Sequence, residues 1–188
     1  MVFCESEVKR DVTRYRAIEG VVRVASSEQE YFFLKKDKHG EDFIESFDEV
    51  LIVAIDQDGS VLFARELSPA FAHTPVLILP GGTAEDKERP EATANRELQE
   101  EIGMQANHLE YLGELWPWSK YLTVRSHLFL AHDLVPSKLP GDEAEPVETV
   151  RIPWKEIDPM VADGRLNDAR AIAALYRVRL ALGAPKGD

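Results

Sequence analysis

Apolar residues along this chain form two kinds of pattern, and one of them, short apolar segments separated by polar turns, is typical of β-strands. The clearest strand signal is the unbroken apolar run from Val50 to Ile55, which suits a strand covered on both faces. The tetrapeptide 56–59 (Asp-Gln-Asp-Gly) predicts a hairpin turn after it. Further strands are expected at 17–26, 30–36, 61–66, 75–79, 109–116, 124–134 and 147–153.

The other pattern is helical and marks two longer segments. The first runs from Pro90 to Ile102; proline suits its first turn and Gly103 the position just past its end. The last helix is expected to be capped by Asn167. Its apolar face and its end are expected at Ile172, Leu175, Leu182 and Gly183.

The order of these elements predicts the fold class. Strands come first, then a helix, then strands, a short helix near 154–162 and the final helix. This order favours an α+β protein, a mixed α/β/α sandwich. An N-terminal arm and β-rich segment over 1–47 is expected to precede a main domain over 48–188.

Composition narrows the class of protein. A chain of 188 residues is long enough for one core of ordinary size. It has no apolar run of ~18 residues, so no membrane span is expected. The segment 1–16 lacks the apolar centre of a secretory signal. Cys4 is the only cysteine, which excludes an internal disulfide and fits a cytoplasmic location.

The formal net charge is -12. An acidic protein without a Lys/Arg-rich run is poorly suited to a nucleic-acid backbone, so no nucleic-acid partner is expected. A smaller polyanion can still be bound if cations lie between it and the protein. Outside the stretch 82–104, the charge can equally serve to keep the protein soluble.

Three carboxylates on the first helix are the leading chemical feature. Glu97, Glu100 and Glu101 have the spacing i, i+3, i+4 and lie within one arc of roughly 100°. Divalent cations would offset the mutual repulsion of these carboxylates, because the carboxylate oxygens together form a suitable cation-binding site. Arg96 can pair with Glu100 or reach Glu88. The alternative is a solvated helix face.

The surrounding spacing resembles a known family. The stretch from Gly82 to Met104 is similar, at every required position, to the Nudix box G-x5-E-x7-R-E-U-x-E-E-x-G-U, where U is a bulky apolar residue. This resemblance implies a Nudix fold with an N-terminal β-rich extension. It also implies an enzyme that hydrolyses a nucleoside diphosphate linked to another group, with two or three Mg²⁺ or Mn²⁺ ions.

The resemblance also implies residue roles. Glu97 and Glu101 would be the main metal ligands, with Glu100 as a further ligand and catalytic group and the carbonyl of Gly81 completing a site. Structural roles in the motif would fall to Gly82, Glu88, Arg96 and Gly103.

An acidic loop, 141–146, resembles the ADP-ribose pyrophosphatase branch of the family. There a carboxylate on this loop orients or deprotonates the attacking water. Glu143 is the candidate base and Glu145 an additional metal ligand, and the two roles can be exchanged. The alternative is a solvated acidic loop.

Other segments bear on the substrate. The stretches 127–134 and 164–170 also resemble the ADP-ribose and ADP-sugar branch, and the N-terminal strands resemble a segment exchanged across a homodimer. Arg65 either binds substrate or is a surface charge at a strand end, and Trp118 either stacks on adenine or covers a sheet edge. Ile78 departs from the branch, which usually has glutamate there.

The sequence therefore predicts hydrolysis of ADP-ribose, an ADP-sugar or a related ADP compound to AMP and a phosphorylated second product. The alternatives are another diphosphate (a GDP-sugar, a dinucleotide or a nucleoside triphosphate) and a non-catalytic nucleotide-sensing module. Neither the base nor the second moiety follows from these motifs.

Overall fold

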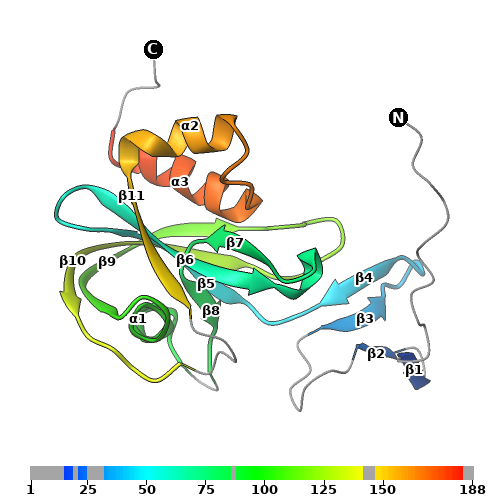
Figure 1. Ribbon diagram of the computed structural model, residues 1–188. Helices are drawn as coiled ribbons and strands as arrows, with labels where there is room; N and C mark the ends of the chain where they lie inside the picture. Colours follow the sequence, from blue (N-terminus) through cyan, green and yellow to red (C-terminus); the bar gives the residue numbers. More distant parts are fainter. Residues whose placement is uncertain (1–14, 19–20, 25–31, 86–87, 142–146, 184–188) are drawn as a thin grey trace. The chain divides into compact units, whose positions relative to one another are not determined.

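The computed structural model describes residues 15–18, 21–24, 32–85, 88–141 and 147–183 (Figure 1). The chain divides into two compact units. One comprises residues 1–46 with 118–123, and the other comprises residues 47–117 with 124–188.

The first unit contains a four-stranded antiparallel sheet in the order β1-β2-β3-β4. Its strands are β1 (Tyr15–Ile18), β2 (Val21–Val24), β3 (Phe33–Lys36) and β4 (Asp42–Glu45). The segment 118–123 joins this unit through β4, because the amide of Ile44 donates to the carbonyl of Tyr121 at 2.7 Å. The strand β4 was not predicted from the sequence.

The second unit is built on a seven-stranded mixed sheet in the order β11-β6-β5-β10-β9, with β7 paired to β6 and β8 to β5. Its strands are β5 (Glu49–Ile55), β6 (Ser60–Ser68), β7 (Thr74–Ile78), β8 (Gly81–Thr83), β9 (Met104–Leu115), β10 (Ser126–Pro136) and β11 (Glu148–Pro153). Its helices are α1 (Pro90–Glu101), α2 (Ile157–Ala162) and α3 (Ala169–Ala181), with 3-10 turns η2 (Pro69–Phe71) and η3 (Trp154–Glu156). Among the pairings of the described strands, β5 with β10 is parallel.

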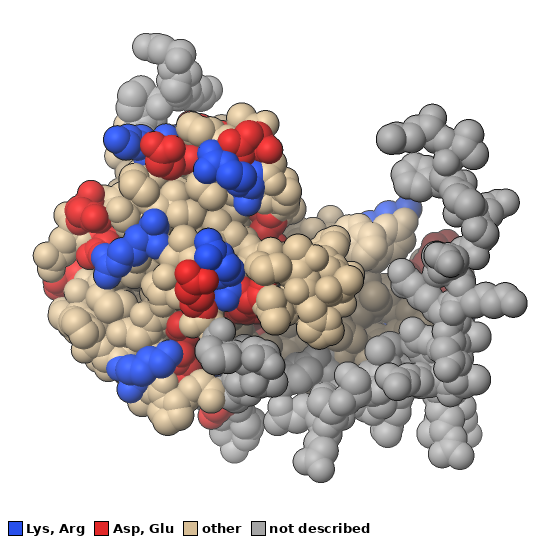
Figure 2. Space-filling view, viewed as in Figure 1, with Lys and Arg blue, Asp and Glu red and all other residues tan. Residues whose placement is uncertain are grey.

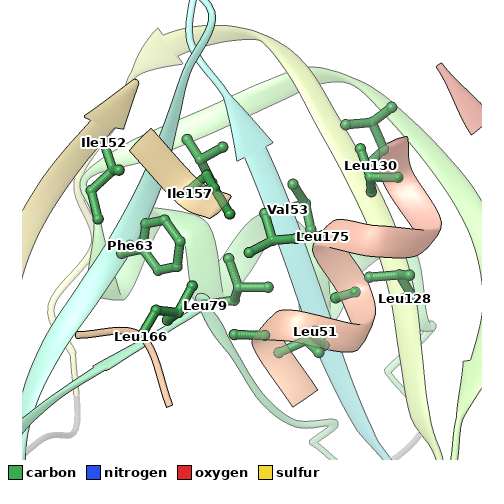
Figure 3. Packing of buried hydrophobic residues seen from close by; sticks show 14 residues of the cluster. Leu51, Val53, Phe63, Leu79, Leu128, Leu130, Ile152, Ile157, Leu166 and Leu175 are labelled. Atoms are coloured by element: carbon green, nitrogen blue, oxygen red, sulfur yellow. The ribbon is translucent and has the colours of Figure 1, made fainter. Parts of the chain in front are cut away.

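Helices cover both faces of this sheet, which confirms the α/β/α sandwich (Figure 1). Successive strand residues point to opposite faces. Leu51 and Val53 of β5 therefore pack with Leu175 of α3 (Figure 3), whereas Val50 and Ile52 pack in a second cluster under α1. The buried run of β5 thus supplies both halves of the core.

Strands β5 and β6 pair with each other over only part of their length, and this leaves room for β8 with its two glycines, Gly81 and Gly82. Strand β6 pairs with β5 only near its start and then with β7, while the start of β5 pairs with β8. Gly81 and Gly82 lie opposite Leu51 and Val50, so the two glycines belong to a short strand. Gly81 suits this place because an added Cβ would overlap the carbonyl oxygen of Val50.

Several predicted boundaries need correction. The cap of α3 is Asp168, whose side chain accepts from the amide of Ala171 at 2.7 Å; Asn167 instead donates to the carbonyl of Gly164. Strand β9 begins at Met104, directly after α1, rather than at residue 109. None of the described helices has both the length and the apolar character needed to cross a membrane.

Candidate active site

Helix α1 carries the candidate site and has clear ends. Pro90 occupies its first turn, and Gly103 follows its end with a φ of 68°, the left-handed conformation that favours glycine. Ala94 and Leu98 are fully buried against the sheet. This packing fixes the rotation of the helix, and with it the direction of its carboxylates.

Two of these carboxylates are buried against β8. Glu97 is 8% exposed and Glu101 is 5% exposed. The amide of Gly81 donates to Oε2 of Glu101 at 3.1 Å. Glu97 lies over Gly82 so closely that a Cβ added there would be 2.6 Å from its Cδ. Because Gly81 and Gly82 have no side chains, the carboxylates of Glu97 and Glu101 can lie directly against the backbone of β8.

Arg96 links the helix to the strand. Its guanidinium donates to Glu88 (Nη2 to Oε2, 3.1 Å), to Glu100 (Nη1 to Oε2, 2.8 Å) and to the carbonyl of Thr83 (Nη2, 3.1 Å). Nη1 also lies 2.9 Å from Oε1 of Glu97. The sequence offered Glu88 and Glu100 as alternative partners, and Arg96 binds both.

These contacts favour the ionised forms of both Glu88 and Arg96. Burial opposes ionisation of Glu88, but the hydrogen bond from Arg96 and those from the amide of Glu85 and the hydroxyl of Thr93 outweigh it, so the pKa of Glu88 lies below its ordinary value. Burial also opposes the charge of Arg96, and its acidic neighbours, Glu88 foremost, raise the pKa of Arg96 above its ordinary value.

The oxygen donors at this site match the preference of Mg²⁺ and Mn²⁺ for hard ligands. Glu97, Glu101 and the carbonyl of Gly81 would hold the ion, and Arg96 contacts both Glu97 and Glu100. Within the described residues, no three acidic, histidine or cysteine side chains converge on one position. A complete shell would therefore use water or substrate phosphate as well, which is common for Mg²⁺.

The predicted base and additional ligand, Glu143 and Glu145, lie outside the described residues. The chain that leads toward them is attached to the end of α1. Ser137 Oγ donates to Oε1 of Gln99 at 2.8 Å, and Lys138 Nζ donates to the carbonyl of Glu100. Residues 137 and 138, which precede the acidic loop in the chain, are therefore held at the C-terminal end of α1.

The two predicted substrate residues are in different surroundings. Arg65 of β6 is exposed and donates to Oε2 of Glu148 on β11 at 2.9 Å. Trp118 belongs to the first unit, is 60% exposed and packs edge-on against Tyr121 at a ring-centroid distance of 5.2 Å. The structure does not bring either residue to Glu97 or Glu101 through a described contact.

A groove that the motifs did not predict lies beside β7. Its volume is about 820 Å³, within the range of small-molecule sites. It is lined by the end of the β6–β7 hairpin, residues 66–69, 71 and 74–78, and by residues 164, 165 and 167–170 before and at the start of α3. These two segments are about a hundred positions apart, so no local sequence pattern predicts that they form one groove. Of the two, only the stretch 164–170 was noted in the sequence, through its resemblance to the ADP-ribose and ADP-sugar branch.

The fold and this site define the class of protein. The model of the NUDIX domain matches residues 45–175, so the chain belongs to the Nudix family.

Among individual relatives, the chain is 41% identical over 86 residues to the ADP compounds hydrolase NudE of Escherichia coli (strain K12), which covers 46% of each protein. It is 28% identical over 133 residues to the ADP-ribose pyrophosphatase of Bacillus subtilis (strain 168), covering 70% of this chain and 71% of the relative. The match to the first of these spans about half of that relative's length. A crystal structure of an ADP compounds hydrolase is 28% identical, superposes with a TM-score of 0.69, and covers 93% of this chain and 97% of its own.

Proposed function

We propose that this protein hydrolyses the diphosphate bond of ADP-ribose, an ADP-sugar or a related ADP compound, giving AMP and a phosphorylated second product. The observation that carries the proposal is the pair of buried carboxylates, Glu97 and Glu101, held against Gly81 and Gly82. The names of the two relatives and of the solved structure support ADP-linked compounds as the substrate class.

The residues would divide the work as follows. Bound Mg²⁺ or Mn²⁺, two or three ions in all, would neutralise the diphosphate and lower the pKa of a coordinated water. Glu97, Glu101 and the carbonyl of Gly81 would hold these ions, with Glu100 as a further ligand or catalytic group. Arg96 keeps α1 against β8 through Thr83.

The acidic loop would supply the remaining carboxylates. Glu143 accepts the proton of the attacking water, and Glu145 is an additional metal ligand. The contacts of Ser137 and Lys138 with α1 support this assignment, because these residues lie only a few positions before Glu143 in the chain. Arg65 would bind substrate phosphate after leaving Glu148, and Trp118 would stack on the base.

The assembly belongs to the same proposal. The protein is a cytoplasmic homodimer in which the strands of residues 1–47 contact the partner subunit. Light scattering of the intact chain tests this; a mass of one chain at micromolar concentration would contradict it.

The activity is tested with ADP-ribose, ADP-glucose, GDP-mannose, NADH and a diadenosine polyphosphate, each with Mg²⁺ or Mn²⁺ and with product identification. AMP from the ADP compounds is the expected product. Preference for GDP-mannose would move the assignment to another Nudix hydrolase, and binding without turnover would indicate a sensing module.

The acidic loop is tested by separate Glu143→Gln and Glu145→Gln variants, with Glu110→Gln on the exposed face of β9 as the matched control. Loss of a general base lowers kcat by ~10²–10⁴-fold. A base at Glu143 predicts this loss in the first variant, while a ligand at Glu145 predicts a higher metal requirement in the second. Full activity in both variants would refute the role of the loop.

A further inference from the structure

Two histidines lie directly opposite each other on the neighbouring strands β9 and β10. His108 pairs with His132 in the antiparallel register, and their rings stack with centroids 4.6 Å apart and planes inclined by 23°. Both residues are exposed. Within the described part of the chain neither ring has a hydrogen bond or an ion pair, so the ring nitrogens are available to a ligand.

A third histidine on these strands is in a different situation. Nδ1 of His127 lies 3.2 Å from the hydroxyl of Tyr111, and its Nε2 lies 3.8 Å from Oδ2 of Asp48. Both nitrogens of that ring therefore have protein partners. The pair of His108 and His132 differs from it because each ring contacts only the other ring.

The histidine pair lies on the α3 face of the sheet. His132 follows Leu130 by two positions, and alternate residues of a strand share a face. Leu130 packs in the cluster that contains Leu175 of α3 (Figure 3). Glu97 and Glu101 belong to α1 on the other face, so a ligand of the histidine pair would be separate from the candidate active site.

The backbone beside His132 is unusual. Ala131 and Leu134 both pack in the cluster under α1, so the alternation of β10 changes between them. Asp133 lies at this change with a φ of 54°, a left-handed conformation that is uncommon for a residue other than glycine. Strained residues of this kind persist where the surrounding structure maintains them, and they are frequent at binding sites.

The spacing of the rings suits a metal ion. Imidazole is a common ligand of Zn²⁺, Cu²⁺ and Ni²⁺. With nitrogen–metal distances of ~2.0–2.1 Å, two imidazoles in adjacent coordination positions have ring centroids roughly 4.5–5 Å apart. The observed 4.6 Å lies within this range. The rings need only rotate to direct a nitrogen at one ion, which exposed side chains do readily, and the strands need not separate.

The surroundings favour a cation. Glu110 is exposed and, two positions after His108 on β9, lies on the same face of the sheet. The chain has a formal net charge of -12. Acidic and basic side chains are interspersed among the described residues on the face drawn in Figure 2. A divalent ion is therefore attracted by the charge of the whole protein.

We propose that His108 and His132 bind one divalent ion of the late first transition row, such as Zn²⁺, at a site distinct from the carboxylates of α1. Within the described residues no third histidine, cysteine or acidic side chain converges with the pair, so water completes the coordination and binding is reversible. The bound ion links β9 to β10. This inference does not depend on the proposed function.

Binding is measured at the two rings themselves, because α1 also offers metal ligands. Zn²⁺ is titrated into the intact protein, and the imidazole resonances of His108, His132 and His39 are followed by NMR. We expect Zn²⁺ to shift the resonances of His108 and His132 together, with one affinity, and to leave those of His39 in place. Cu²⁺ in place of Zn²⁺ should give an EPR spectrum with two coordinated imidazole nitrogens.

Two variants test whether the histidines act as a pair. His108→Gln and His132→Gln should each weaken Zn²⁺ binding at the remaining ring by at least about tenfold, because two ligands held on one rigid sheet bind more tightly than either alone. Each variant should leave one coordinated imidazole in the Cu²⁺ spectrum. His39→Gln, at another exposed histidine, is the matched control and should change neither measurement.

Three results would overturn the inference. The first is that the resonances of His108 and His132 stay in place at about 1 mM Zn²⁺, which would mean that the rings only stack. The second is that each single variant binds Zn²⁺ as tightly as wild type, which would mean that the rings act separately. The third is a Cu²⁺ spectrum of the wild-type protein without two imidazole nitrogens, a measurement that needs no variant to fold.

Discussion

Replacing Gly82 by alanine tests whether β8 sets the position of Glu97. The strand is extended backbone, which alanine adopts without strain. The new Cβ would lie 2.6 Å from Cδ of Glu97, whereas carbon atoms in ordinary contact are ~3.5–4.0 Å apart. The carboxylate must therefore move by about 1 Å. A displacement of this size costs on the order of 100-fold in rate.

The same substitution has a cost in stability. Overpacking of a buried site costs ~1–3 kcal/mol. The smaller conformational freedom of alanine in the unfolded chain returns ~0.4–1 kcal/mol. The net loss of ~1–2 kcal/mol corresponds to a fall in Tm of roughly 4 °C for a protein of this size.

The assay compares kcat for ADP-ribose with Tm from calorimetry, in wild type and in a Glu97→Ala background. Without the Glu97 carboxylate the added methyl group has room, so Gly82→Ala should then cost little stability; this double-mutant cycle isolates the contact. A Gly82→Ala variant with kcat within about threefold of wild type, or an equal fall in Tm in both backgrounds, would refute the reasoning.

Three further predictions follow from the same contacts. Glu101→Gln should lower kcat by about 100-fold or more while Tm falls by only ~3 °C, since one charge-assisted hydrogen bond to Gly81 is weakened; unchanged turnover would remove the metal-site argument. Arg170→Met should lower the free energy of unfolding in urea by ~2 kcal/mol, because Glu49 loses its guanidinium partner in a partly buried place, and a loss below ~0.5 kcal/mol would contradict this. The pKa of Glu88 is lowered by folding, so its contribution to stability is present above its ordinary pKa of 4.5 and is lost as pH falls through the lower folded value. Glu88→Gln should therefore flatten the decline of Tm between about pH 5 and pH 3, and an unchanged slope would count against the shift.

Local signals predicted most of helix α1. Pro90 and Gly103 mark its ends within the chain itself, and the spacing of Glu97 and Glu101 places them on one face whatever surrounds the helix. The cap of α3 was misplaced by one residue because Asn167 and Asp168 are both good caps, and only the folded backbone decides which oxygen reaches the amide of Ala171.

Features that depend on distant pairings could not be predicted in the same way. Gly81 and Gly82 resemble turn residues, and their strand conformation follows from pairing with β5, some thirty positions earlier. The groove needs the β6–β7 hairpin and the segment before α3, which share no local pattern. Periodicity identifies elements, but it does not indicate which of them become neighbours.

The buried strand β5 leaves its own alignment ambiguous. Residues 50–54 are apolar on both faces, so sliding the strand by one position would exchange one core for the other at little hydrophobic cost. Glu49 removes the ambiguity, because its carboxylate meets Arg170 and the hydroxyl of Ser126 only on the α3 side. A one-residue slip would separate this ion pair and would also carry Val50 away from Gly82. The geometry of the carboxylates under α1 is thus secured by a polar contact on the opposite face of the sheet.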